Sequence, residues 1–258
     1  MAFENEREDL IEGRNAVIEA LRAGRAIDKI FIAKGEVDKT LGHIASKARE
    51  AGVVVVEADR RKLDAMSVTH AHQGVVAQSA VREYATIEQL LARAEEKGEP
   101  PFLVACDEIS DPHNLGAILR TAECVGAHGV LIPKRRSAGL TATVDKASAG
   151  AAEHLPVARV ANMASALREL KEKGLWIYGT AADGESPLWE TDFSGPVCLV
   201  IGSEGEGMSR VVAEQCDFRV SIPMHGRIGS LNASAAAAVV MYEVLRRRTQ
   251  NGKRKMEN

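Results

Sequence analysis

The stretch FLVACDEI at residues 102–109 decides the fold of most of this chain. It is an apolar run that ends in acidic residues, which is typical of a central strand in a parallel sheet, buried on both faces. Further strands are predicted at 128–132, 175–181, 197–201 and 218–222. Helices are predicted between them at 114–125, 143–149, 162–173 and 230–248. Strands that alternate with helices in this way indicate an α/β domain on a parallel sheet, of nucleotide-fold type.

A smaller α/β domain is predicted before this strand. Helices at 14–24 and 38–51 alternate there with strands at 27–33, 53–57 and 74–80. The charged, partly helical segment 82–101 ends in two prolines, and we interpret it as the connection between domains. The predicted division is a first domain at 1–82, a linker at 83–101 and a second domain at 102–258.

The charge balance excludes a protein that holds nucleic acid by bulk charge alone. The 258 residues include 33 Lys and Arg against 36 Asp and Glu, a net charge of −3. Any RNA contact must therefore come from local basic patches, such as Lys134, Arg135 and Arg136 or the basic tail 246–255, which we expect to be frayed. No apolar run approaches the ~20 residues of a membrane helix, so a cytoplasmic protein without membrane contact is predicted.

The cysteines and histidines do not follow a metal-binding pattern. The 4 cysteines include no CxxC pair, and none of the 7 histidines pairs with carboxylates at metal-ligand spacing. A GxSxG nucleophile elbow is also missing, which argues against a serine hydrolase. We therefore expect no metal and no Ser/His/Asp chemistry.

Three other segments carry polar residues at informative positions. In the first, DPHNLGAILRTAECVGAHGV (111–130), Asn114 and Arg120 are six residues apart, so they could project from related sides of one helix. Pro112 and Asn114 also suit a plain helix start, and Arg120 also suits a surface cation. The spacing alone leaves both interpretations open.

The second segment, LVIGSEGEGMS (199–209), runs from a buried strand into a glycine-rich loop. Gly202, Gly205 and Gly207 surround Glu204 there. Glycines let a backbone approach a ligand beyond the carboxyl end of a strand, where open α/β sheets bind ligands. The loop matches neither a P-loop nor GxGxxG, so a phosphate cradle is disfavoured, and a flexible turn with an exposed acid is the alternative.

The third segment is SIPMHGRIGSLNASAAAAVVMYEVL (221–245), in which a strand ends and a loop leads into a helix. Ser230 and Asn232 lie where that helix is expected to start, before an alanine-rich face. One of them is expected to cap the helix. Small polar groups with free backbone N–H groups also suit an uncharged or zwitterionic ligand.

Taken together, the three segments resemble the SpoU (TrmH-type) branch of the SPOUT RNA 2′-O-methyltransferases, in order and spacing, over residues 102–245. The stretches IEGRNAVIEAL and HQGVVAQ (72–78) are similar to the substrate-binding domain of the subgroup that methylates a large-subunit (23S) rRNA guanosine. The resemblance implies an α/β trefoil-knot methyltransferase domain after a small α/β, ribosomal-protein-like RNA-binding domain. It further implies S-adenosylmethionine (AdoMet) as methyl donor and a homodimer.

The resemblance also implies roles for individual residues. The positions that match the family's catalytic or substrate site are Asn114, Arg120, Glu204, Ser230 and Asn232. The positions that match its cofactor site are Gly202, Ile222 and Leu231, and the same pocket is expected to include Thr180 and Ala181. A guanidinium stays protonated, so we interpret Arg120 as a stabiliser of phosphate and alkoxide that acts across the subunit interface. The RNA phosphate or Glu204 would then accept the ribose proton.

The activity implied is methyl transfer from AdoMet to the ribose 2′-hydroxyl of a 23S rRNA guanosine. A tRNA ribose methyltransferase is one alternative, although the tRNA guanosine enzymes generally lack this N-terminal domain. An adenosine-directed antibiotic-resistance methyltransferase with a comparable two-domain plan is another. A non-catalytic RNA-binding assembly factor is the alternative outside the enzyme class.

Overall fold

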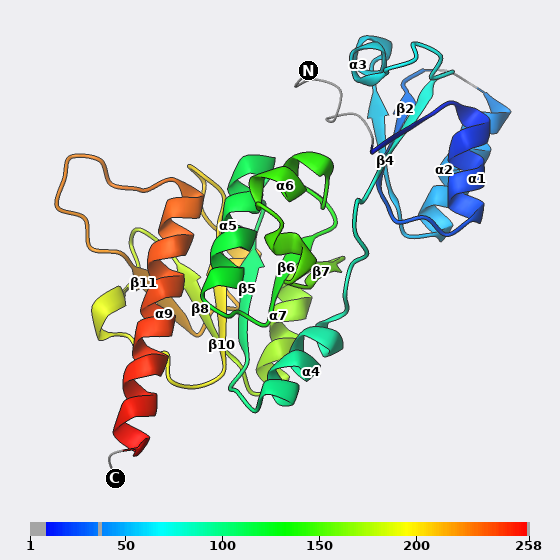
Figure 1. Ribbon diagram of the computed structural model, residues 1–258. Helices are drawn as coiled ribbons and strands as arrows, with labels where there is room; N and C mark the ends of the chain where they lie inside the picture. Colours follow the sequence, from blue (N-terminus) through cyan, green and yellow to red (C-terminus); the bar gives the residue numbers. More distant parts are fainter. Residues whose placement is uncertain (1–8, 36–37, 257–258) are drawn as a thin grey trace. The chain divides into compact units, whose positions relative to one another are not determined.

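The computed structural model describes residues 9–35 and 38–256, with side chains as far as residue 250, and it contains two α/β units (Figure 1). The first unit is Met1–Glu83 together with Gly139–Thr143, and the second is Tyr84–Ala138 together with Val144–Asn258. Each unit has its own sheet and its own hydrophobic core. The predicted class, a small α/β domain followed by a parallel α/β domain, agrees with this arrangement.

The first unit is built on a four-stranded sheet of order β1-β4-β2-β3, in which only the β2–β3 pair is parallel. The strands are β1 (Leu10–Glu12), β2 (Ile27–Ala33), β3 (Val54–Ala58) and β4 (Val75–Ser79). The helices are α1 (Arg14–Arg22), α2 (Lys39–Glu50) and α3 (Arg60–Met66). Val17 of α1 and Ile44 of α2 are buried in one core cluster and Leu63 of α3 in another, so helices cover both faces of the sheet.

The second unit is built on a parallel seven-stranded sheet of order β7-β6-β5-β10-β8-β11-β9. The strands are β5 (Phe102–Cys106), β6 (Gly129–Pro133), β7 (Val157–Val160), β8 (Trp176–Thr180), β9 (Ser186–Pro187), β10 (Val197–Ile201) and β11 (Phe218–Ser221). β10 lies between β5 and β8 although it follows both in the chain. The long apolar runs of the sequence thus form the middle of the sheet, as strands buried on both faces require.

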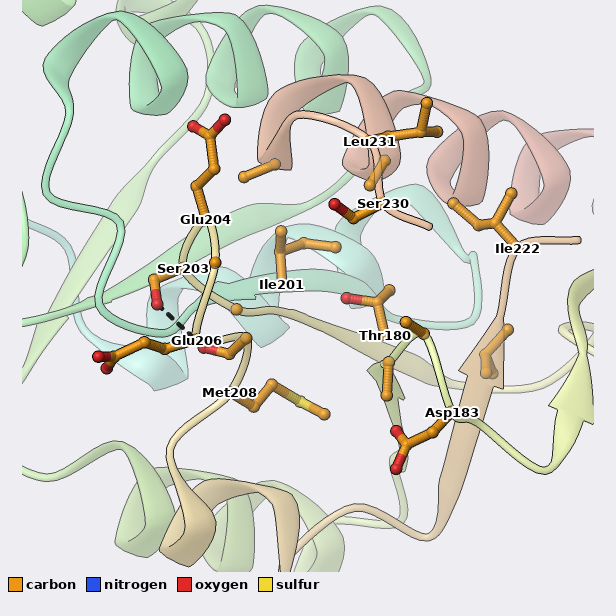
Figure 2. Close-up of a pocket in the computed structure, with 18 of the residues that line it drawn as sticks. Thr180, Asp183, Ile201, Ser203, Glu204, Glu206, Met208, Ile222, Ser230 and Leu231 are labelled. Carbon is orange, nitrogen blue, oxygen red and sulfur yellow. Dashed lines mark hydrogen bonds between the residues drawn. The ribbon is translucent and has the colours of Figure 1, made fainter. Parts of the chain in front are cut away.

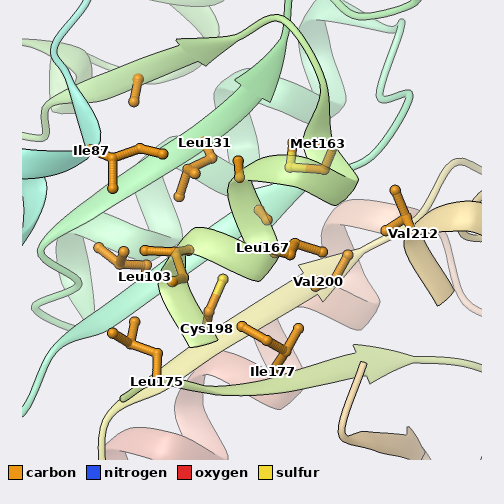
Figure 3. Close-up of a cluster of buried hydrophobic side chains, with 14 of the residues drawn as sticks. Ile87, Leu103, Leu131, Met163, Leu167, Leu175, Ile177, Cys198, Val200 and Val212 are labelled. Atoms are coloured by element: carbon orange, nitrogen blue, oxygen red, sulfur yellow. The ribbon is translucent and has the colours of Figure 1, made fainter. Parts of the chain in front are cut away.

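Helices cover both faces of this sheet. They are α4 (Ile87–Lys97), α5 (Pro112–Cys124), α6 (Ala142–Ala147), α7 (Met163–Glu172), α8 (Arg210–Ala213) and α9 (Ala233–Met256), with 3₁₀ turns at Ala151–Glu153 and Leu188–Glu190. One core cluster joins strands β5, β6, β8 and β10 to α4, α7 and α8 (Figure 3). Helices α5 and α9 pack against each other on the opposite face (Figure 1).

Several elements differ from the sequence expectations. The segment 83–101, interpreted as a linker, contains α4, and the side chains of Ile87, Leu90 and Ala94 are buried in the core of the second unit. Strand β7 and helix α3 were not predicted. The tail expected to fray continues α9 to Met256, and Arg248 is anchored by hydrogen bonds to carbonyl oxygens, at 2.8 Å from Pro100 for example. The side chains of residues 251–255 lie outside the described part.

Candidate cofactor and RNA site

A cavity of about 460 Å³ opens at the carboxyl ends of β8, β10 and β11 (Figure 2). Its walls come from three connections, the residues after β8 (180–183), the loop after β10 (202–208) and the connection from β11 to α9 (222–231). The volume lies within the range of about 300–1,000 Å³ that is usual for small-molecule sites. Ligands of open parallel sheets bind at this edge, so the fold places the cavity where a cofactor is expected.

The five residues predicted to hold the cofactor all line this cavity: Thr180, Ala181, Gly202, Ile222 and Leu231. Glu204 and Ser230, predicted for the substrate side, line it too. The Thr180 hydroxyl donates to the carbonyl oxygen of Val200 at 3.0 Å, which fixes that side chain at the end of β10. The structure therefore brings these positions together, whereas their individual roles stay predictions.

The loop after β10 is folded tightly on itself. The amide of Ser203 donates to the carbonyl oxygen of Gly207 at 2.9 Å, and the amide of Gly207 donates back to that of Ser203 at 3.0 Å. A Cβ at Gly202 would lie 2.2 Å from the backbone carbon of Gly207 and from the nitrogen of Met208, so only glycine fits there. Gly205 and Gly207 have φ of +90° and +71°, a conformation that favours glycine.

Asn114, Glu204 and Asn232 form one hydrogen-bonded cluster beside the cavity. The Asn232 amide nitrogen donates to Asn114 Oδ1 at 3.0 Å and to Glu204 Oε2 at 3.4 Å, and the Asn114 amide nitrogen donates to the same Glu204 oxygen at 3.4 Å. Asn232 also caps α9, because its Oδ1 accepts from the amide of Ser234 at 2.9 Å. Two other segments, α5 and the start of α9, therefore donate to the Glu204 carboxylate at the edge of the cavity.

Arg120 is not part of this cluster. An α-helix rises about 1.5 Å and turns about 100° per residue, so Arg120 lies about 9 Å along the axis of α5 from Asn114 and about 120° around it. Asn114 is buried and Arg120 is exposed, so the two do not project from related sides of the helix, a possibility that their spacing had left open. Arg120 does not line the cavity and has no hydrogen-bond or ion-pair partner within the described residues.

Other lining residues were not singled out from the sequence. Asp183 follows β8 and its carboxylate accepts from the Arg219 guanidinium at 2.5 Å, while Ile201 and Met208 flank the glycine loop. A polar residue within a few positions of the carboxyl end of a parallel strand is a signal that could have found Asp183. The Cys216 thiol lies against Met208, one of the lining residues. Burial raises the pKa of this thiol to about 12, so it stays protonated and is no nucleophile at neutral pH.

The basic residues divide into exposed and structural ones. Arg135 and Arg136 are both exposed beyond β6, and the Arg136 guanidinium also pairs with Glu108 at 3.1 Å. In the tail, Arg246 and Arg247 bind the buried Glu243 carboxylate at 2.6 and 2.8 Å. The described arginines of the tail are thus held in intramolecular contacts, and their charge is in part unavailable to a ligand.

Two negative findings concern the described residues alone. No helix among residues 9–35 and 38–256 is long and apolar enough to cross a membrane. In the same part of the chain, no group of three or more His, Cys, Asp or Glu side chains is arranged to hold a metal ion.

A parallel sheet with a cavity at its carboxyl edge, formed by a glycine loop and a capped helix, is the arrangement in which proteins of the α/β class bind small ligands. Two family models identify the class further. The SpoU rRNA Methylase family matches residues 101–242, and the RNA 2′-O ribose methyltransferase substrate-binding family matches residues 10–85. The chain belongs to the SpoU methylase family, as the sequence resemblance predicted.

Relatives and solved structures agree with this assignment. YacO of Bacillus subtilis (strain 168), named as a TrmH family tRNA/rRNA methyltransferase, is 50% identical over 96% of this chain and 99% of its own length. AviRb from Streptomyces viridochromogenes, a SpoU methyltransferase solved with AdoMet, is 25% identical, covers 93% of this chain and 90% of its own, and has a TM-score of 0.60. An AdoMet-bound rRNA methyltransferase from Sinorhizobium meliloti gives 25% identity, coverage of 93% and 87%, and a TM-score of 0.58.

A tRNA-modifying structure aligns over less of the chain. The A. aeolicus TrmH/SpoU tRNA modifying enzyme is 29% identical, with a TM-score of 0.53, and covers 64% of this chain and 85% of its own. The protein is therefore an AdoMet-dependent RNA methyltransferase that acts on tRNA or rRNA. The predictions of enzyme class, cofactor and fold class are confirmed at this level.

The cavity fits AdoMet on its own features. Glycine at position 202 keeps the loop backbone closed against itself where a Cβ would force it apart. Ile201, Ile222 and Leu231 line the cavity with apolar surface of the kind that suits an adenosyl group, and the loop backbone and Ser230 add polar groups.

Proposed function

We propose that this protein transfers the methyl group of AdoMet to the ribose 2′-hydroxyl of a guanosine in 23S rRNA. One observation carries the proposal: Glu204 both lines the cavity and belongs to the hydrogen-bonded cluster with Asn114 and Asn232. A ribose hydroxyl that binds this cluster would lie next to a cofactor in the cavity.

The domain composition supports rRNA as the substrate. The AdoMet-bound rRNA methyltransferase aligns over 93% of this chain, whereas the tRNA-modifying structure aligns over 64%. The first unit matches a substrate-binding family at residues 10–85, and we assign it the recognition of the rRNA segment.

We assign the cofactor to the cavity through Gly202, Ile222, Leu231, Thr180 and Ala181. When bound there, AdoMet supplies a methyl group made electrophilic by its sulfonium charge. Gly202 and its loop set the backbone against the cofactor, and the apolar side chains of Ile222 and Leu231 exclude water from it. No metal is required, because the leaving group is a neutral thioether.

Glu204 accepts the ribose proton in this proposal. A neutral hydroxyl is a weak nucleophile, so its proton has to leave while the oxygen–carbon bond forms. The amide nitrogens of Asn114 and Asn232 both donate to Glu204 Oε2 and hold that carboxylate in place. Ser230, exposed in the same cavity, orients the ribose.

Arg120 acts from a second copy of the chain. It is exposed and away from its own cavity, and it stabilises the RNA phosphate and the developing negative charge on the ribose oxygen. Apolar surface supports a homodimer, because Met224, Ile228 and Leu231 before α9 are exposed, Ile228 by 76%. Sedimentation at micromolar concentration tests this, since a species of about 28 kDa, the mass of one chain, contradicts the dimer.

The test of the activity is methyl transfer from labelled AdoMet to total RNA of cells that lack this protein, followed by size fractionation and nuclease mapping. Label at the ribose of a 23S guanosine supports the proposal. Label confined to tRNA, or at an adenosine, keeps the chemistry and overturns the substrate. If no RNA becomes labelled although the protein binds AdoMet, the protein is a non-catalytic RNA-binding factor.

A further inference from the structure

We infer that Asp107 is a positioning residue of the methyl-transfer site, which holds the loop 202–208 in the place where it binds AdoMet. Asp107 does not line the cavity and is not a catalytic residue. The inference rests on the proposed role of this cavity as the AdoMet site.

Asp107 is bonded to both ends of the loop. It directly follows β5, and its amide donates to the carbonyl oxygen of Ile201, the last residue of β10, at 2.8 Å. Its carboxylate Oδ2 accepts from the amide of Ser209, the first residue after the loop, at 2.7 Å. One residue of the neighbouring strand thus joins the entry and the exit of the loop.

The two kinds of hydrogen bond have different effects. The bonds between Ser203 and Gly207 close the loop on itself and so fix its shape. They do not fix where that closed loop lies relative to the sheet. The bond from Ser209 to Asp107 provides this restraint, because β5 is a central strand, paired on both sides.

Burial makes this bond strong. Asp107 is only 3% exposed, so solvent screens its charge little, and a charged acceptor forms a stronger bond than a neutral one. An alanine at this position would leave the Ser209 N–H without its acceptor in a part-buried position. The exit of the loop could then move, and with it the Gly202 and Glu204 backbone that borders the cavity.

The experiment measures AdoMet affinity of the full chain by calorimetry for Asp107→Ala, Asp107→Asn, Ser209→Pro and the double variant Asp107→Ala/Ser209→Pro. Ser209 has φ of −60°, so proline suits its backbone angle and removes the N–H donor. We expect Asp107→Ala to weaken binding about tenfold, since loss of a charged hydrogen bond is worth about that factor. Asp107→Asn keeps an acceptor oxygen and is expected to stay within about threefold.

The double variant and a matched control separate positioning from general damage. If Asp107 and Ser209 act through one bond, the double variant binds AdoMet no more weakly than the weaker single variant. The control is Asp217→Ala, since Asp217 Oδ2 accepts from the amide of Ile177 at 2.9 Å, at the amino end of β8 and away from the cavity. Its AdoMet affinity is expected to equal that of the wild type.

A second readout needs no cofactor. Hydrogen exchange of the Ser209 amide in the free protein is expected to accelerate in Asp107→Ala and to stay slow in Asp107→Asn. Three results would each overturn the inference. The first is unchanged hydrogen exchange and unchanged AdoMet affinity in Asp107→Ala. The others are additive losses of AdoMet affinity in the double variant and a loss of affinity in Asp217→Ala equal to that in Asp107→Ala. A wild-type chain that does not bind AdoMet would instead overturn the proposed function of the cavity.

Discussion

Replacement of Gly202 by alanine tests the geometry of the loop 202–208, which we propose binds AdoMet. The added Cβ would lie 2.2 Å from the backbone carbon of Gly207 and the nitrogen of Met208, against at least 3.4 Å for an ordinary contact. The shortfall is 3.4 − 2.2 = 1.2 Å, and both contacts are with backbone, so no side chain can rotate away. The loop has to open by about this distance.

The magnitude follows from the bonds that this opening breaks. The two backbone bonds between Ser203 and Gly207 measure 2.9 and 3.0 Å, and a shift of more than 1 Å removes both. At about 1 kcal/mol each the loss is about 2 kcal/mol, which corresponds to about a 30-fold weaker binding of AdoMet. Calorimetric titration of the full chain with AdoMet measures it.

The matched control is Gly226→Ala, in the connection before α9. A Cβ there meets nothing closer than the amide nitrogen of Ile228 at 3.9 Å, and no positive φ is required. We expect this variant to bind AdoMet like the wild type. If Gly202→Ala also bound within twofold of the wild type, the reasoning from loop geometry would be refuted.

Three further predictions concern other parts of the chain. Asn232→Ser keeps an oxygen that can cap α9 but removes the amide donor to Glu204, so the thermal unfolding temperature is expected to stay within about 2 °C of wild type while the methyl-transfer rate falls at least tenfold; a rate equal to wild type would contradict the cluster. Partial burial raises the pKa of Glu12, but hydrogen bonds from Ser67, Thr69 and the amide of Val68 outweigh it and lower this pKa to about 2. Because its pKa is depressed, ionised Glu12 stabilises the fold at pH values above about 4.5, and this stabilisation is lost as the pH falls toward 2. Glu12→Gln is therefore expected to lower the free energy of unfolding by about 1–2 kcal/mol at pH 7, after allowance for solvent screening. The difference in stability between wild type and variant is expected to narrow in melts below pH 4.5, and a difference independent of pH would contradict this prediction. Arg248 donates to the carbonyl oxygens of Pro100, Pro101 and Gly195 at 2.8–2.9 Å, so Arg248→Ala is expected to lower the free energy of unfolding by about 2–4 kcal/mol in chemical denaturation. The control Arg210→Ala removes only an exposed ion pair with Glu214 and is expected to cost less than about 0.5 kcal/mol.

Much of the fold follows from patterns within single segments. The predicted strands at 27–33 and 197–201 coincide with β2 and β10, because 197–201 is wholly apolar and 27–33 ends in the apolar run IFIA, which the sheet buries. Strand β7 was missed since its four residues, VARV, include an arginine and form a weak pattern. Helix α4 was interpreted as part of a linker because its exposed charges conceal three buried positions that only the core of the second unit reveals.

The site was predictable in its parts and less so in its assembly. The three motifs pointed to residues that the structure brings to one cavity and one cluster. The relative orientation of Asn114 and Arg120 could have been read from their spacing, because six residues place two side chains about 120° apart on a helix. Asp107 was also not identified, since its role depends on a hydrogen bond to Ser209, 102 residues further along the chain.

The order of the strands has a consequence for folding kinetics. Strands β5, β6 and β7 are consecutive neighbours and can pair early, whereas β8 has no place beside them until β10 has inserted between β5 and β8. Contacts between segments this distant in sequence form slowly, because a long loop has to close first. Insertion of β10 also brings residues 202–208 to the edge of the sheet, so the cavity is expected to form only after this insertion.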